Sequence, residues 1–187
     1  MKVGTVVGAN NFLNLPMSFR IIIDARFQSP ISLMEALVRL DQVLELCGFF
    51  HDKENPDTGI SHAYLHRVAK FVPWPNVDRQ FQEGEIIDLV YLSRETFGTS
   101  YDEGPFPIQL VIMTGNSPLG GSHGFGISTN LWTGSSKRPW WPTAMQLLER
   151  VACDLHKEFD CKRTIIRCDN RDDDLNQTEG ILFERPI

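Results

Sequence analysis

The chain has little positive charge for its length. Its 187 residues include 18 lysines and arginines against 24 aspartates and glutamates, which gives a net charge of −6 and a pI near 5.3. A domain that binds nucleic acid by releasing counterions from phosphates needs the opposite balance. The deficit argues against DNA, RNA and anionic membranes as the main partner. It favours a basic protein partner, although an acidic excess that only serves solubility explains it equally well.

Long hydrophobic runs are also missing. No window approaches the roughly 20 apolar residues of a membrane span. The apolar run at the N-terminus is interrupted by Gly4 and Gly8 and is too short for the core of a secretory signal. We therefore expect a cytoplasmic protein with no membrane partner.

Cysteine is scarce and has no metal-binding pattern. None of the four forms a C-x-x-C pair or has a histidine at zinc-ligand spacing. His62 and His66 are four residues apart, but the residue after the first is Ala63, where a zinc protease has glutamate. We expect a surface histidine pair, no metal and no cofactor. The cysteines are expected to be reduced and mostly buried, and they are Cys47, Cys153, Cys161 and Cys168.

What is present is the composition of a folded domain. Hydrophobic residues make up 42% of the chain, aromatic residues 10% and charged residues 22%, all within the globular range. A chain of this length suits one domain. Strands separated by helices and hairpins, without regular βαβ alternation, predict an α+β fold with a mixed or antiparallel sheet and helices packed on one side.

The strongest local pattern predicts a helix over residues 32–47. Ser32 and Glu35 have the spacing of a capping box, and leucines recur at helical spacing until Gly48, which suits a left-handed cap. A second helix is expected from Pro142 to Phe159, since proline is favoured in a first helical turn. The remaining expectations are strands at 18–26, 108–114, 124–132 and 163–168, a polar loop at 49–61, a short helix at 62–70, an extended 71–75 segment and a turn-like tail from 169. Residues 84–97 suit either a helix that ends near Gly98 or, from their Ile-Ile-Asp-Leu-Val-Tyr-Leu run, a strand, and we favour the helix.

One segment matches the G-x-S-x-G nucleophile motif of serine hydrolases. It runs from Gly120 to Gly124, with Ser122 as the nucleophile. That motif requires a tight turn between a strand and an immediately following helix. Here the preceding strand is expected to end at Thr114, and a strand rather than a helix follows. The only later histidine is His156, so a flexible hairpin loop is the better interpretation and a small serine hydrolase is an alternative.

Two features indicate a protein interface. The first is the pair Trp140 and Trp141, because tryptophan is enriched at binding hot spots, although packing in the core is the more frequent role of such a pair. The second is the C-terminal segment 169–187, whose six acids and two bases hold two-thirds of the net charge. It is either a soluble tail or an electronegative patch that steers a basic partner. The candidate contacts are Asp102, Glu103, Trp140, Trp141, Asp169, Asp172, Asp173 and Asp174.

The order of elements resembles the immunity protein 52 family of bacterial polymorphic toxin systems, in particular its type VI secretion immunity proteins. The resemblance includes the Phe19–Ile23 strand, the leucine-rich helix ending at Leu40–Leu44, the Gly124–Trp132 strand and the 143–159 helix. It implies a non-catalytic α+β inhibitor of a cognate nuclease toxin with a restriction-endonuclease-like fold. Such a toxin would be basic in order to hold DNA. A cytoplasmic adaptor domain is the other alternative, and the identity of the upstream gene would separate the two.

Overall fold

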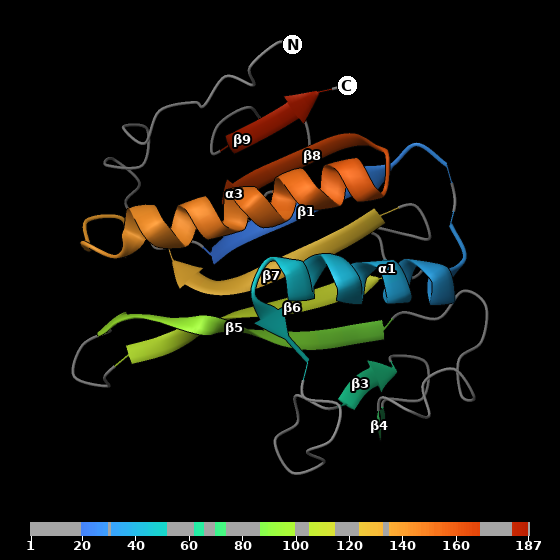
Figure 1. Ribbon diagram of the computed structural model, residues 1–187, viewed down its shortest axis with the longest axis horizontal. Helices are drawn as coiled ribbons and strands as arrows, with labels where there is room; N and C mark the ends of the chain where they lie inside the picture. The colour runs from blue at the N-terminus through green and yellow to red at the C-terminus, as the bar shows by residue number, and fades with distance from the viewer. Residues whose placement is uncertain are drawn as a thin grey trace.

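The structure, a computed structural model, has one antiparallel sheet with two helices on one of its faces (Figure 1). It describes residues 20–29, 31–51, 62–65, 70–73, 87–99, 105–114, 124–132, 135–168 and 181–186. Every strand pairing in this part of the chain is antiparallel. The α+β fold expected from the sequence is therefore confirmed, with an antiparallel rather than a mixed sheet.

The nine strands of the described chain form the order β4-β3-β5-β6-β7-β1-β8-β9, with β2 paired to β5 beside this path. Their bounds are β1 Arg20–Phe27, β2 Phe49–Phe50, β3 His62–Leu65, β4 Lys70–Pro73, β5 Ile87–Thr99, β6 Pro105–Thr114, β7 Gly124–Trp132, β8 Cys161–Cys168 and β9 Ile181–Pro186. The helices are α1, Leu33–Leu46, and α3, Trp141–Glu158. Neither helix combines the length and apolar character that a membrane crossing requires.

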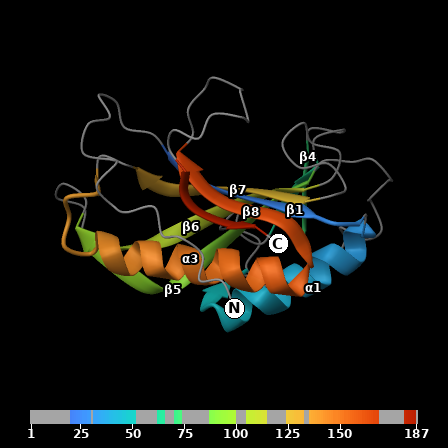
Figure 2. The ribbon, with the colours of Figure 1, turned by 90° about the horizontal axis from the view of Figure 1, so that it is seen from above.

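Strand β1 lies in the middle of the sheet, between β7 and β8. Its alternate residues Ile21, Ile23 and Ala25 are fully buried, because side chains alternate across a sheet and one set faces the helices. Figure 2 shows both described helices, α1 and α3, on the same side of the sheet. The described core therefore lies between the sheet and these two helices.

Helix α1 begins as the sequence predicts. The hydroxyl of Ser32 accepts a hydrogen bond from the Glu35 amide at 3.3 Å, which satisfies one of the unpaired amides of the first turn. Leu37, Leu40 and Leu44 are buried against the sheet. These residues confirm both the start of the helix and its inward face.

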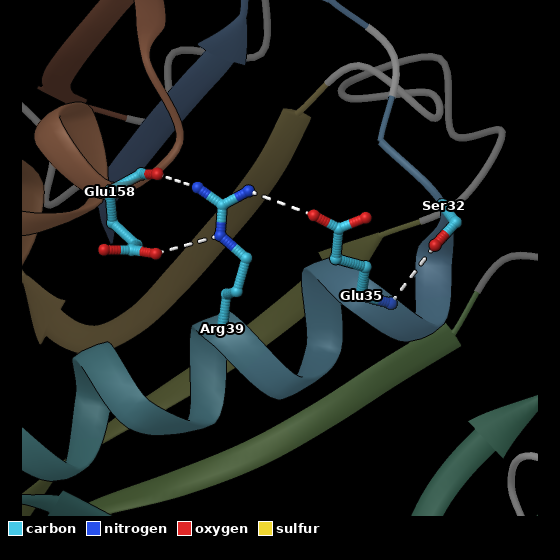
Figure 3. Close-up of polar contacts among 4 residues, drawn as sticks. All are labelled: Ser32, Glu35, Arg39 and Glu158. Carbon is cyan, nitrogen blue, oxygen red and sulfur yellow. Dashed lines mark hydrogen bonds and ion pairs between the residues drawn. The ribbon is translucent and has the colours of Figure 1, made fainter.

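Arg39 joins the two helices (Figure 3). Its Nε donates to the Glu158 carboxylate at 2.9 Å, and its Nη2 donates to the Glu158 carbonyl at the end of α3. Its Nη1 lies 3.4 Å from Glu35 on the same helix, and its guanidinium lies 4.8 Å from the ring centroid of Phe159. One side chain thus links the start of α1 to the end of α3.

Three phenylalanines fill the core below the end of α3. Phe27, Phe125 and Phe159 come from β1, β7 and the residue after α3, and their ring centroids are 4.9 to 5.1 Å apart. The two edge-to-face pairs and one stacked pair are geometries that aromatic rings prefer. The cluster fixes α3 on the centre of the sheet.

Of the two alternatives for 84–97, the favoured helix is wrong, because Ile87–Thr99 forms the long strand β5. Leu89, Tyr91 and Ser93 are buried in strict alternation, so the period of two decides the conformation. A bulge then inserts extra residues between Leu92 and Thr96 relative to β6. Before this bulge both faces of the strand carry apolar residues, so their positions also suit a helical spacing.

Three other expectations are wrong, because part of each segment forms a strand. The helix at 62–70 is replaced by β3 and the start of β4, which pair with each other. The loop at 49–61 begins instead with β2, where Phe49 pairs with Ser93. The turn-like tail ends in β9, which pairs with β8. In each case the strand is stabilised by a partner distant in sequence or at the sheet edge, which local patterns do not reveal.

Candidate protein-binding surface

The exposed side of α1 and the adjoining strand β2 carries apolar side chains. Leu46 is 75% exposed, Val38 is 56% exposed and Phe50 is 38% exposed. Val38 and Leu46 are on α1, and Phe50 follows Leu46 by four residues on β2. A lone exposed apolar residue is common, but several large ones on neighbouring elements are typical of a contact site. We call this the α1–β2 surface, and it consists of Glu35, Val38, Gln42, Glu45, Leu46 and Phe50.

The outward position of the α1 side chains in this surface follows from the helical period. Glu35, Val38, Gln42 and Glu45 are separated by three or four residues, so they form one line along the helix. That line lies opposite the buried leucines of the same helix. The sequence pattern that marked the inner face therefore also placed Val38 outside.

The backbone at the end of the surface is held firmly. Gly48 has a φ of +88°, a left-handed conformation that disfavours a side chain. Its carbonyl accepts from the Arg94 amide of β5 at 2.8 Å. The carbonyl of Leu46 accepts from Nη2 of Arg150 on α3, also at 2.8 Å. The turn that presents Leu46 and Phe50 is thus fixed to both the sheet and the second helix.

The helical layer is acidic. Its two helices contain six carboxylates and three arginines or lysines, apart from one histidine. The carboxylates are Glu35, Asp41, Glu45, Glu149, Asp154 and Glu158, and the cations are Arg39, Arg150 and Lys157. The net negative charge of these two helices favours a partner whose surface is basic.

The two candidate tryptophans pack within the protein. Trp141 is 7% exposed and belongs to the core, at the start of α3. Trp140 is half-buried, and its ring meets Phe106 edge-to-face with centroids 5.3 Å apart. It also covers Gly98 so closely that a Cβ there would overlap the indole. Trp141 therefore offers little area to a partner, and Trp140 is only partly exposed.

The predicted acidic contacts lie outside the described residues. These are Asp102, Glu103, Asp169, Asp172, Asp173 and Asp174. Their role in binding stays a prediction from the sequence.

The structure describes only some of the residues that the serine hydrolase alternative requires. Ser122 and His123 are outside the described residues, and His156 is on α3 as expected. Its Nδ1 lies 3.1 Å from Oγ1 of Thr164 on β8, so this nitrogen is engaged inside the fold. Of the histidine pair, His62 lies in strand β3, and His66 lies outside the described residues.

The buried cysteines are poor nucleophiles. Burial raises the pKa of the Cys47 thiol to about 12, assisted by the negative charge of Asp154. Burial likewise raises the pKa of Cys161 and of Cys168 to about 11. All three remain protonated at neutral pH, whereas the reactive form is the thiolate. Within the described residues, no three His, Cys, Asp or Glu side chains gather as metal ligands would.

Leu46, Val38 and Phe50 were not among the residues singled out from the sequence. The signal that could have found Val38 and Leu46 is their position off the inward face of a well-predicted helix. Phe50 had no such signal, because β2 was not expected.

Comparison with known proteins gives no match to a family model, a curated protein or a solved structure.

Proposed function

We propose that this protein is a cytoplasmic inhibitor that binds a basic nuclease toxin through the α1–β2 surface. The observation that carries the proposal is the exposure of Leu46, Val38 and Phe50 in an acidic helical layer. The resemblance to immunity proteins, described from the sequence, supplies the class of partner. The chain's net charge of −6 agrees with a partner that must itself hold DNA.

The mode of action follows from these chemistries. Leu46 and Phe50 would be buried in the complex and provide most of its free energy, since apolar anchors near the centre dominate interfaces. Carboxylates around them would speed association and select a basic surface. An inhibitor bound in this way excludes DNA from the same surface and needs no catalytic residue of its own.

The test begins with capture of partners from the host by the whole protein, followed by purification of the captured protein. That protein is then assayed for DNA cleavage with increasing amounts of inhibitor. We expect a basic nuclease whose activity is abolished at a molar ratio near one. Leu46→Asp should raise the dissociation constant at least tenfold, which corresponds to the loss of about 1.4 kcal/mol from an interface anchor.

Trp132→Ala provides the matched control, because Trp132 is also exposed but lies at the end of β7. It should inhibit like the unchanged protein. The variant D172S/D173S/D174S, measured in the same assay, tests whether the C-terminal carboxylates speed association. Captured proteins that are not inhibited, or equal inhibition by Leu46→Asp and the unchanged protein, would overturn the proposal.

A further inference from the structure

Strand β5 is longer than the strands that pair with one of its two edges. On one side β6 pairs with both of its halves. On the other side β3 and β2 pair only with residues up to Ser93, and the Arg94 amide then donates to the Gly48 carbonyl. Among the residues that the structure describes, no strand pairs with the rest of β5 on this side. We call residues 95–99 on this side the free edge of β5.

The backbone of Thr96 points to the free edge. Thr96 pairs with Pro107 of β6, and proline has no N–H group to donate. In an antiparallel ladder, two opposite residues either exchange two hydrogen bonds or direct their backbone groups away from each other. Pro107 cannot exchange two, so the N–H and C=O groups of Thr96 are directed away from β6. Thr96 is also exposed, so a strand beside it can reach both groups.

The free edge is held in place by the sheet beneath it. Phe97 is only 4% exposed and belongs to the core. At the bulge, the hydroxyl of Ser93 donates to the Glu95 carbonyl at 2.6 Å and accepts from the Ile108 amide at 2.8 Å. An edge that is already ordered loses little conformational entropy when another strand pairs with it.

The free edge adjoins the α1–β2 surface. Phe50 pairs with Leu92 on the same side of β5, and the Glu45 carboxylate lies 3.9 Å from the Arg94 guanidinium. The second half of β5 extends beyond this pairing (Figure 1). Glu95 is exposed and forms no ion pair with any residue that the structure describes. A partner seated on the α1–β2 surface therefore has a backbone edge and a carboxylate next to it.

We propose that an extended segment of the bound toxin pairs with the free edge of β5 and adds a strand to the sheet. The inference rests on the proposed function for the identity of the partner. Strand addition to an exposed edge is a recurrent binding mode in which main-chain hydrogen bonds supply the affinity. Residues 95–99 extend over roughly 17 Å, the length of an ordinary strand.

The chemistry of this edge also selects the segment that binds. The bulge and the charges of Arg94 and Glu95 hinder chance pairing with other chains, as such features do at many sheet edges. A basic side chain opposite Glu95 forms a favourable cross-strand pair. The segment is therefore extended and carries a lysine or arginine, in agreement with a basic toxin.

The test compares two changes at one position in the whole protein. Thr96→Pro removes the outward N–H, and proline is tolerated in an edge strand where that group is unpaired. It should raise the dissociation constant for the captured toxin roughly tenfold or more, because it leaves an acceptor in the complex unpaired. Thr96→Ala is the matched control. It also removes the side chain but keeps the N–H, so its dissociation constant should stay within about twofold of that of the unchanged protein.

Hydrogen exchange in the unchanged protein provides a second measurement, which does not depend on the folding of a variant. The amide of Thr96 should exchange at least tenfold more slowly in the complex than in the free protein, because it becomes hydrogen-bonded. Equal exchange in both states overturns the proposal, and so does equal binding by Thr96→Pro and Thr96→Ala. Dimerisation of the isolated protein that Thr96→Pro abolishes also overturns it, since a second copy would then occupy the edge.

Leu46→Asp in the same assay separates this inference from the proposed function. If Leu46→Asp binds weakly while both Thr96 variants bind like the unchanged protein, the inhibitor proposal stands and pairing at the free edge is wrong. A captured protein that is not a nuclease overturns the proposed function, and exchange of the Thr96 amide in its complex still decides whether the free edge pairs with a partner.

Discussion

At the scale of single residues, the contact between Gly98 and Trp140 determines how the start of α3 meets the sheet. The indole lies where a side chain at position 98 would be. The same ring contacts Phe106 of β6 and lies next to the buried Trp141. A glycine inside a strand costs conformational entropy, and here it is compensated by the close approach of an aromatic ring.

Gly98→Ala should therefore destabilise the protein. A methyl group at this position must displace the Trp140 ring from its contact with Phe106, and overpacking of this kind costs about 1–3 kcal/mol. The change is measured as the shift in the free energy of unfolding in urea, followed by tryptophan fluorescence.

The double-mutant cycle gives the control for that measurement. In a Trp140→Ala background, Gly98→Ala should cost less than about 0.5 kcal/mol, because its steric conflict is gone. An equal cost in both backgrounds would place the conflict elsewhere.

At the scale of elements, the helical layer acts as a unit because α1 and α3 are joined at both ends. Arg39 connects the first half of α1 to the end of α3, and Arg150 of α3 binds the last turn of α1. The α1–β2 surface therefore rests on an element that is fixed at two points rather than on an isolated helix. Such fixing lowers the conformational entropy lost when a partner binds.

Arg39→Met tests the first of these two connections. It removes the hydrogen bonds to Glu158 while keeping much of the side chain's apolar volume, so we expect a loss of about 1 kcal/mol, at the upper end for exposed ion pairs. Arg39→Lys should not restore stability fully, since one ammonium cannot reproduce the planar fork between carboxylate and carbonyl. Urea unfolding at low and high salt measures both variants.

Lys157→Met is the matched control for this prediction. Lys157 is an exposed cation of α3 whose nearest carboxylate oxygen, on Asp154, is 4.0 Å away. Its replacement should change stability little. If Arg39→Met proves equally harmless, the junction contributes nothing measurable.

The two helices and the strand at 18–26 could be predicted from the sequence because their patterns are local. Ser32, the leucine period and Gly48 define α1 without reference to any other element. Strand β5 could not be distinguished from a helix, because apolar residues on both of its faces fit the two periods alike. Strand β9 depends on pairing with β8, and no pattern in its own segment indicates that partner.

At the scale of the whole molecule, the buried thiols link stability to alkaline pH. The pKa values of Cys161 and Cys168 are raised from 9.0 to about 11 because burial disfavours the thiolate. Tyr91 is raised in the same direction by burial and by Asp41. Above the ordinary value the unfolded chain loses these protons while the folded chain keeps them, so folding becomes less favourable as pH rises.

We expect the free energy of unfolding to be insensitive to these thiols below pH 9 and to fall between pH 9 and 11. The measurement is urea unfolding across that interval, under reducing conditions. The double variant Cys161→Ala/Cys168→Ala should show a shallower fall, because lysine and tyrosine ionisation is common to both proteins. Parallel curves for the two proteins would show that the thiols do not contribute.

The central position of β1 has a consequence for how the chain reaches its native state. Its neighbours β7 and β8 follow it by roughly a hundred residues or more, so the middle of the sheet closes only after most of the chain is available. Contacts so distant in sequence require large loops to close first, which slows folding. Until then the isoleucine-rich segment has no partner strand and can associate with other chains. During synthesis on the ribosome, β1 therefore stays without its partner strands until β7 and β8 have been made.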